Sequence, residues 1–361
     1  MKTKHYATVI CLAGFLLVFG LWSLLRPADA ISVSERRPLA QAPALSFQTI
    51  RDGTFMDKAE SYAVDQFPLR ESFRTLKALV SYDLLRQKDH HGVYLSDGYA
   101  AQMDYPMNTA SLDHAAERFA EVCKTYLQGS KVYLSVVPDK NYFMAKENGV
   151  PALDYEAFVA YLREKTSQMT YVDLFDTLRL SDYYRTDSHW RQEALQPVAQ
   201  KITAAMGATT GTYTERTLDR PFYGVYYGYA ALPMQPDTLR YLMSDTLAGC
   251  TVWNYETNSA GDVYDLAAAQ GDDPYALYLS GSVSLLRIDN PNAATDRELI
   301  VFRDSFGSSL APLLVESYAS VTLVDIRYLP TARLGRFIDF HGQDVLFLYS
   351  TSVLNNSETL Q

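Results

Sequence analysis

The chain has 361 residues, of which 48% are hydrophobic and 20% are charged, so it can bury a large core and is not broadly disordered. Its length suggests about two domains, or one α/β domain that carries a large insertion. Lys and Arg number 32 against 42 Asp and Glu, which gives a formal charge of -10. Because an acidic chain lacks the basic groups that bind a phosphate backbone, we expect no nucleic acid partner.

The first predicted element is a membrane-spanning helix. Ala7 to Leu25 is a run of 19 uncharged, mostly apolar residues, and a helix of about 20 residues crosses the roughly 30 Å core of a bilayer. Lys2 and Lys4 precede the run, so the positive-inside rule leaves the N-terminus in the cytoplasm. The protein is therefore expected to be membrane-anchored and extracytoplasmic, in the periplasm or at the cell surface, or secreted if a signal peptidase cuts near Ala30.

After this anchor or signal segment, taken as residues 1–30, the stretch 31–46 has no apolar period and is predicted to be a tether. Residues 47–361 are predicted to form the folded domain. It begins with two helices, at about Phe55–Val64 and Leu69–Leu85. Apolar residues recur in the second helix at spacings of three and four, so we expect this face to pack on something apolar; they are Phe73, Leu76, Val80 and Leu84.

Strands and helices alternate through most of the remaining chain. The predicted strands are Gly92–Leu95, Lys131–Val137, Thr170–Leu174, Glu298–Arg303, Ser320–Ile326 and Asp344–Tyr349. The predicted helices are Ala110–Leu127, Tyr155–Ser167, Arg191–Met206, Ser308–Tyr318 and Thr331–Phe337. From about 207 to 295 we expect a β-rich insertion, with extended runs at Leu239–Met243 and Cys250–Tyr255. This alternation is typical of an α/β fold whose mostly parallel sheet has helices on both faces.

Two cysteines, Cys123 and Cys250, lie outside the apolar N-terminal run. They are too few for a disulfide scaffold and too far apart for a zinc site of C-x-x-C spacing. They could pair in an oxidising compartment, or they could be two buried thiols.

A carboxylate and an imidazole, Asp187 and His189, stand two residues apart. In an extended segment this spacing places both side chains on one face. An Asp beside a His fixes the tautomer of the ring and stabilises the imidazolium that forms when the ring takes a proton. The alternative is that both residues are structural, near the start of a helix.

A serine, Ser305, follows the predicted strand Glu298–Arg303 at a turn into a helix. The hydroxyl there projects from the carboxyl edge of the sheet, and backbone N–H groups from Ser305 to Gly307 could hold an oxyanion. The alternative is that Ser305 is an N-cap. Together with Asp187 and His189 it supplies a nucleophile, a base and an orienting carboxylate at the edge where open sheets bind ligands.

Several motifs in the chain resemble, in their order, those of the DHHW proteins, whose body is similar to the SGNH hydrolase-like domain of the alginate O-acetylation proteins AlgX and AlgJ. They are Ser34-Glu35-Arg36-Arg37-Pro38-Leu39-Ala40, Asp65-Gln66-Phe67-Pro68-Leu69-Arg70, Gly92-Val93-Tyr94-Leu95, Pro138-Asp139-Lys140, Thr186-Asp187-Ser188-His189-Trp190, Asp304-Ser305-Phe306-Gly307 and Asp325-Ile326-Arg327-Tyr328. Ser188 stands where the family's name has its first His.

This resemblance implies an SGNH hydrolase-like fold with a catalytic triad of Asp187, His189 and Ser305 that acts on acyl esters of a cell-envelope or exported polysaccharide. Arg327 and Tyr328 follow the strand after Ser305 and are expected at the same sheet edge, as substrate contacts or as a surface ion pair. Trp190 is a further candidate for substrate contact.

The predicted function is serine-dependent transfer or removal of an acyl group, with acetyl as the expected group and with no cofactor. The expected partners are the polysaccharide, the membrane and a multi-span membrane acyltransferase that donates the acyl group. The rival hypothesis is a non-catalytic envelope protein that binds glycan through the same cleft and the Tyr-rich insertion, or that acts as a scaffold in an export complex.

Overall fold

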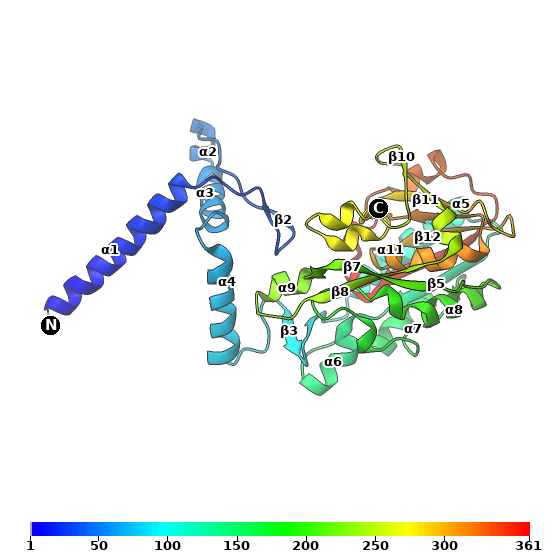
Figure 1. The fold of residues 1–361 in the computed structure, drawn as a ribbon, viewed down its shortest axis with the longest axis horizontal. Coiled ribbons are helices and arrows are strands. Elements are labelled where there is room, and N and C mark those ends of the chain that lie inside the picture. Colours follow the sequence, from blue (N-terminus) through cyan, green and yellow to red (C-terminus); the bar gives the residue numbers. More distant parts are fainter. Residues whose placement is uncertain (1) are drawn as a thin grey trace. The chain divides into compact units, whose positions relative to one another are not determined.

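The computed structural model describes residues 2–361. The chain divides into two compact units. Unit 1 contains the residues up to His91 and the segment Tyr227–Pro233, and unit 2 contains Gly92–Tyr226 and Met234–Gln361. Their elements are labelled along the chain in Figure 1.

Unit 1 begins with α1, Lys2–Leu25. α1 is long and apolar enough to cross a membrane, and a signal sequence has the same length and composition. A short antiparallel pair follows, β1 (Ile31–Ser32) with β2 (Arg37–Pro38). The remaining helices of the unit are α2 (Phe47–Arg51), α3 (Thr54–Asp65) and α4 (Arg70–Leu79), which continues into a π-helical turn at Val80–Leu84, together with most of α9 (Val225–Ala230).

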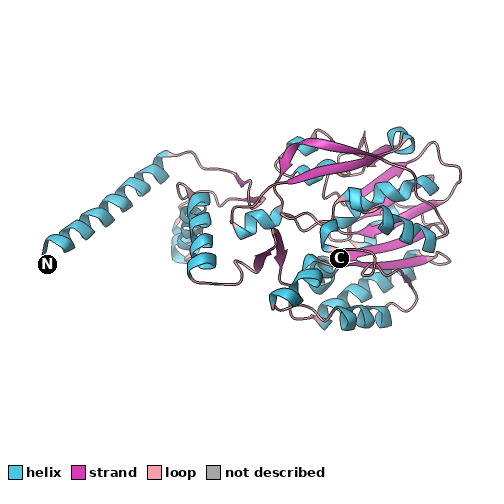
Figure 2. Cartoon of the chain, turned by 60° about the horizontal axis from the view of Figure 1, so that its bottom comes forward, coloured by secondary structure: helices cyan, strands magenta, loops and turns pink. Residues whose placement is uncertain are grey.

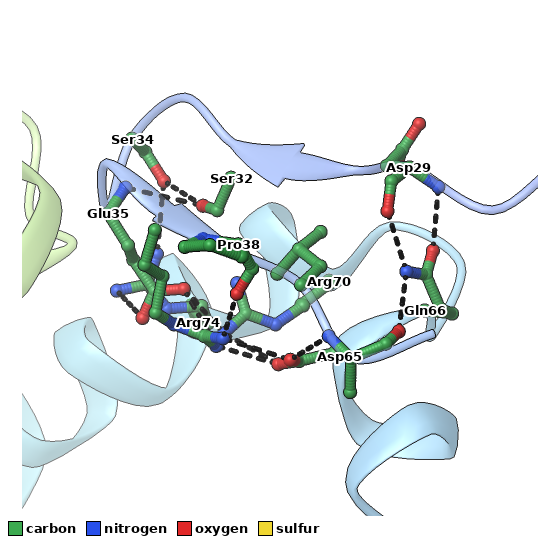
Figure 3. Close-up of polar contacts among 12 residues, drawn as sticks. Asp29, Ser32, Ser34, Glu35, Pro38, Asp65, Gln66, Arg70 and Arg74 are labelled. Atoms are coloured by element: carbon green, nitrogen blue, oxygen red, sulfur yellow. Dashed lines mark hydrogen bonds and ion pairs between the residues drawn. The ribbon is translucent and has the colours of Figure 1, made fainter. Parts of the chain in front are cut away.

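Ion pairs fasten the predicted tether to α3 and α4 (Figure 3). Arg37 bonds Asp65, the last residue of α3, at 2.6 Å, and Arg70 in the first turn of α4 contacts Glu35 at 2.7 Å. The hydrogen bond from Arg37 lowers the pKa of Asp65 from 3.8 to about 2. The segment after β1 is therefore held to the helices by charged contacts, and Leu39, just after β2, is buried.

The predicted apolar face of α4 is present, but most of it is exposed. Its residues Phe73, Leu76, Val80 and Leu84 are between 38% and 73% exposed. Among the described residues the aromatic ring contacts of this face are those of Phe73 with Phe19 and Phe67.

The core of unit 2 is an eight-stranded sheet in the order β10-β9-β11-β13-β12-β14-β5-β6. Five neighbouring strands run parallel: β13 (Ser320–Val324), β12 (Glu298–Arg303), β14 (Asp344–Ser350), β5 (Val132–Val137) and β6 (Thr170–Tyr171). The predicted mostly parallel α/β fold is confirmed. The other three strands are antiparallel and come from the predicted insertion: β11 (Leu285–Asp289), β9 (Thr251–Asn254) and β10 (Ser259–Gly261).

Helices cover both faces of this sheet (Figure 2). Side chains of β12 alternate between two apolar clusters, with Leu299 and Val301 in one and Ile300 and Phe302 in the other. The first cluster includes α8 (Gln196–Ala205) and the segment from α11 (Phe306–Leu310) through the 3₁₀ turn Ala311–Ser317. The second includes α5 (Thr109–Tyr126), α7 (Tyr155–Lys165) and α12 (Thr351–Asn355).

The other elements of unit 2 are shorter. A hairpin joins β3 (Val93–Ser96) to β4 (Tyr99–Gln102), and a ribbon pairs β7 (Thr214–Phe222) with β8 (Asp237–Met243). Two more helices are α6 (Lys140–Asn148) and α10 (Asp245–Gly249). Two predicted α-helices are largely 3₁₀ instead: Ala311–Ser317, where Pro312 lacks the N–H that an α-helix needs, and Thr331–Arg336.

Candidate active site

Asp187, His189 and Ser305 lie in one line of hydrogen bonds. Nε2 of His189 is 2.8 Å from Oγ of Ser305, and Nδ1 is 2.5 Å from Oδ1 of Asp187. Asp187 is fully buried, and the His189 side chain is 12% exposed. In the neutral ring, the carboxylate of Asp187 accepts a hydrogen bond from Nδ1–H. Nε2 is then the nitrogen without a proton, and it faces the serine hydroxyl.

The segment that carries Asp187 and His189 is a loop, and not the extended segment in which their spacing places both side chains on one face. An antiparallel bridge between Tyr183 and Trp190 closes the loop. Inside it, the N–H of His189 donates to Oδ1 of Asp187 at 3.0 Å, the pattern by which an Asp stabilises a turn two residues on. The two side chains therefore meet through a turn. The contact that the spacing predicts is present, but it does not arise from the alternation of an extended segment.

A second segment holds the other oxygen of Asp187. The N–H of Val225 donates to Oδ2 at 2.8 Å. A Cβ atom on Gly224 would lie 2.1 Å from Cβ of Asp187, so the backbone can come this close only at a glycine. Both carboxylate oxygens are thus paired by backbone N–H groups.

A buried lysine, Lys140, holds the loop just before Asp187. Its Nζ donates to the carbonyl oxygens of Tyr184 at 2.9 Å and Arg185 at 3.1 Å, and it lies 4.9 Å from the centre of the Tyr226 ring. Burial lowers the pKa of Lys140 to about 7, and the charge of Asp187 opposes that shift. The sequence had marked Lys140 only as part of a motif.

The imidazole of His189 stacks on Tyr275. The ring centres are 3.9 Å apart with 14° between the planes, and the Tyr275 hydroxyl is 2.9 Å from Oγ of Ser309. Burial raises the pKa of Tyr275 well above 10, so the phenol stays protonated. Tyr275 fixes the plane of the catalytic base candidate, yet nothing in its local sequence marks it.

Trp190 does not line the site, and the expectation that it contacts substrate is wrong. Its side chain is fully buried. The indole N–H donates to the carbonyl oxygen of Phe306 at 3.1 Å and to Oγ of Ser309 at 2.9 Å. A large apolar ring that follows a polar loop packs into the core, where it ties the loop to α11.

The turn at Ser305 uses most of the amides that we expected to face an oxyanion. The N–H of Phe306 donates to Oδ1 of Asp304 at 3.0 Å, and the N–H of Gly307 donates to the Asp304 carbonyl at 3.1 Å. Within residues 2–361 the N–H of Ser305 donates to no backbone acceptor. The expected set of three amides is therefore reduced to that of Ser305.

Arg327 and Tyr328 leave the sheet one strand away from Ser305. In the parallel ladder of β12 and β13, Phe302 is level with Val324, three residues before Ser305 and Arg327 respectively. Arg327 is held by Asp325 through bonds of 2.9 and 2.6 Å, and Tyr328 is 55% exposed. Arg327 does form an ion pair, but with the buried Asp325 and not at the surface, and contact of Arg327 and Tyr328 with substrate stays a prediction.

No protein-family model and no curated protein sequence matches the chain, but solved structures do. A DHHW family protein from Eubacterium siraeum DSM 15702 matches with a TM-score of 0.59 at 20% identity, over 74% of this chain and 93% of that one. The chain shares the fold of a DHHW protein. The sequence-based resemblance is therefore confirmed as a resemblance of fold.

Two other proteins match over similar lengths. Bacillus cereus PatB1, solved with a sulfonyl adduct, matches with a TM-score of 0.58 at 18% identity, over 73% of this chain and 95% of that one. The O-acetyltransferase domain of Pseudomonas putida AlgJ matches with a TM-score of 0.45 at 14% identity, over 73% of this chain and 92% of that one.

Proposed function

We propose that this protein is a serine-dependent acyltransferase or esterase that acts on acetyl esters of a polysaccharide outside the cytoplasm. The observation that supports the proposal is the unbroken line of hydrogen bonds from Asp187 through His189 to Ser305. A hydroxyl bonded to an imidazole, which is in turn oriented by a buried carboxylate, is the arrangement that activates a serine nucleophile.

In the first half-reaction Oγ of Ser305 attacks the carbonyl carbon of the acyl ester, and its proton passes to Nε2 of His189. Asp187 accepts the hydrogen bond from Nδ1–H and stabilises the imidazolium. The N–H of Ser305 donates to the oxyanion. The C–O bond to the leaving group breaks, the leaving oxygen takes the proton from His189, and an acetyl-serine remains.

In the second half-reaction an acceptor hydroxyl gives its proton to Nε2 of His189 and attacks the acetyl-serine. A sugar hydroxyl as acceptor completes an acetyl transfer, and water completes a hydrolysis. The proton then returns to Oγ of Ser305 as the serine leaves. The half-buried position of Ser305 leaves it reachable from solvent.

The acetyl group and the polysaccharide are proposed from the motifs that the chain shares with the DHHW and alginate O-acetylation proteins. The same motifs favour a multi-span membrane acyltransferase as the donor. The apolar helix α1 supports a location at the outer side of a membrane, as an anchor or as a signal that is removed.

The triad prediction is tested with a fluorophosphonate probe, which reacts with an activated serine, and with hydrolysis of an acetyl ester. Ser305→Ala and His189→Ala should each lower turnover by a factor on the order of a thousand or more, and the double variant should be hardly worse, because residues that act as a unit are not additive. Asp187→Asn should fold and lose most activity through the wrong His tautomer.

A matched control is Ser308→Ala. The Ser308 hydroxyl is buried in α11, the short helix that follows Ser305, and it makes no hydrogen bond within the described residues. It should keep both labelling and turnover. Absence of labelling in the folded wild-type protein, together with saturable glycan binding, would favour the non-catalytic binding function instead.

A further inference from the structure

The apolar face of α4 needs a cover that unit 1 does not supply. Leu76 is 55% exposed and Leu84 is 73% exposed, on the same side as Phe73 and Val80. A contiguous apolar face of this kind on a folded protein marks a place where a protein, a ligand or a membrane binds.

The opposite face of α4 is fastened, so the exposed face has a defined direction within unit 1. Arg74 contacts Glu35 at 3.3 Å and donates to the Gly228 carbonyl at 2.6 Å, and Ala78, one turn on, is fully buried. Figure 3 shows Arg70 and Arg74 pointing into this polar cluster. The side chains of Phe73 and Val80 leave the helix on the other side. Leu76 lies at the edge of that side, 55% exposed, and also borders the hollow near Ser34 and Gly228.

The apolar face begins beside α1. The Phe19 ring stacks on Phe67, with centres 5.3 Å apart, and meets the edge of Phe73 at 5.9 Å. Behind this contact, the N–H of Asp29 donates to Oε1 of Gln66 at 2.9 Å and Nε2 of Gln66 donates to the Asp29 carbonyl at 2.8 Å (Figure 3). The chain leaving α1 is thus clamped to the turn between α3 and α4.

The contacts of Phe19 indicate how deep Phe67 and Phe73 lie relative to the end of α1. Phe19 lies six residues before Leu25, the end of α1, which corresponds to about 9 Å along a helix. Helices that lie in a membrane interface bury their apolar faces about 5–10 Å into the boundary between headgroups and acyl chains. Phe67 and Phe73 therefore lie at the depth of such a helix, if the end of α1 marks the surface.

We propose that the apolar face of α4 lies in the interface of the membrane that α1 spans, with the lipid itself as the partner. The proposal rests on the proposed membrane location. Lys77 flanks the face and Arg86 follows the π-helical turn, and both are exposed, where they can meet lipid phosphates. α4 thereby gives unit 1 a second contact with the bilayer, in addition to α1.

The test uses the full chain with Cys123→Ala and Cys250→Ala, reconstituted in vesicles of phosphatidylcholine and phosphatidylglycerol. A nitroxide is attached at Cys11, or, with Cys11→Ala, at Leu76→Cys or at Thr75→Cys. Thr75 is the matched control, because it precedes Leu76 in α4 and is half-buried, whereas Leu76 is 55% exposed. Relaxation of each label is measured with oxygen, which concentrates in lipid, and with a water-soluble nickel complex.

We expect oxygen to relax the Leu76 label more than the nickel complex does, as it does for the Cys11 label. The Thr75 label should not show this greater relaxation by oxygen. Relaxation of the Leu76 label mainly by the nickel complex would place the face in water and overturn the proposal. Exclusion of both reagents with spin–spin broadening would identify a second copy of the chain as the cover, which also overturns it.

The Cys11 label separates this proposal from the proposed location. If the nickel complex reaches Cys11 as readily as Thr75, α1 is not in the bilayer, and the membrane location fails together with the docking of α4. The triad activity is measured on the same samples and does not depend on either result.

Discussion

At the scale of single residues, the site depends on charges and rings that surround the three candidate catalytic side chains. Asp187 has both oxygens paired by backbone N–H groups, and His189 lies flat against Tyr275. The buried amine of Lys140 donates to the backbone of the loop that leads to Asp187. Such supports hold a hydrogen-bonded triad in one geometry before substrate arrives.

Lys140 makes stability depend on pH. Its pKa is about 7 in the folded protein, against 10.5 for an ordinary lysine, and desolvation is the main cause. Between these values the unfolded chain binds the proton and the folded chain does not, so the free energy of unfolding rises with pH, by on the order of 1 kcal/mol per pH unit. Lys140→Met should lose this rise, as measured by urea unfolding from pH 7 to pH 9.

The matched control for Lys140 is Lys131→Met, an exposed lysine just before β5. It should keep the pH dependence of the wild-type protein. Identical pH profiles for Lys140→Met and the wild type would show that the buried amine does not titrate in this range.

At the scale of elements, the predicted insertion takes part in building the site. The segment that ends β7 and begins α9 brings Gly224 and Val225 against Asp187, and Tyr275 comes from a 3₁₀ turn later in the same region. The parallel strands carry the candidate nucleophile Ser305, and the insertion surrounds Asp187 and the candidate base His189.

Gly224→Ala tests whether the insertion positions Asp187. The new Cβ would lie 2.1 Å from Cβ and 2.4 Å from Cα of Asp187, so the backbone of one segment must move. Because a displacement of about 1 Å can cost about a hundredfold in rate, acetyl-ester turnover should fall by that order while the protein stays folded. Gly261→Ala, where nothing lies within 4 Å, is the control and should match the wild type. Equal turnover in both variants would contradict the role given to this loop.

The sequence predicted the elements whose signal is local. β12 was predicted at its observed bounds, and β5 to within one residue, because buried parallel strands are unbroken apolar runs. The contact of Asp187 with His189 follows from their spacing, although the turn that creates it was not foreseen. Tyr275 and Gly224 could not be assigned, because their roles come from packing between segments far apart in the chain.

At the scale of the whole molecule, unit 2 has two apolar cores, one on each face of the sheet. Cys250 belongs to one of them and Cys123 packs against the other, and both thiols are free. The pairing that the sequence left open is therefore absent from the structure. Burial raises the pKa of both thiols to about 11, which keeps them protonated and unreactive near neutral pH.

Stability should therefore be independent of redox conditions. Adding dithiothreitol should leave the melting temperature of the wild-type protein unchanged in calorimetry, and Cys123→Ala with Cys250→Ala should fold with a loss on the order of 1 kcal/mol. A reductant-induced fall in melting temperature that the double variant does not show would mean that the two cysteines do pair.

The short helix α9 has residues in both units, and this limits where the chain can be truncated. Val225, its first residue, bonds Asp187, while Gly228 accepts from Arg74 and lies so close to Ser34 that a Cβ atom would be 1.7 Å from the Ser34 carbonyl oxygen. A secreted fragment that starts at residue 92, the obvious choice for purification, would keep the first contact and delete the other two. α9 would then lose the contacts of one end while its first residue still holds Asp187, so enzymology on that fragment would understate the activity of the intact protein.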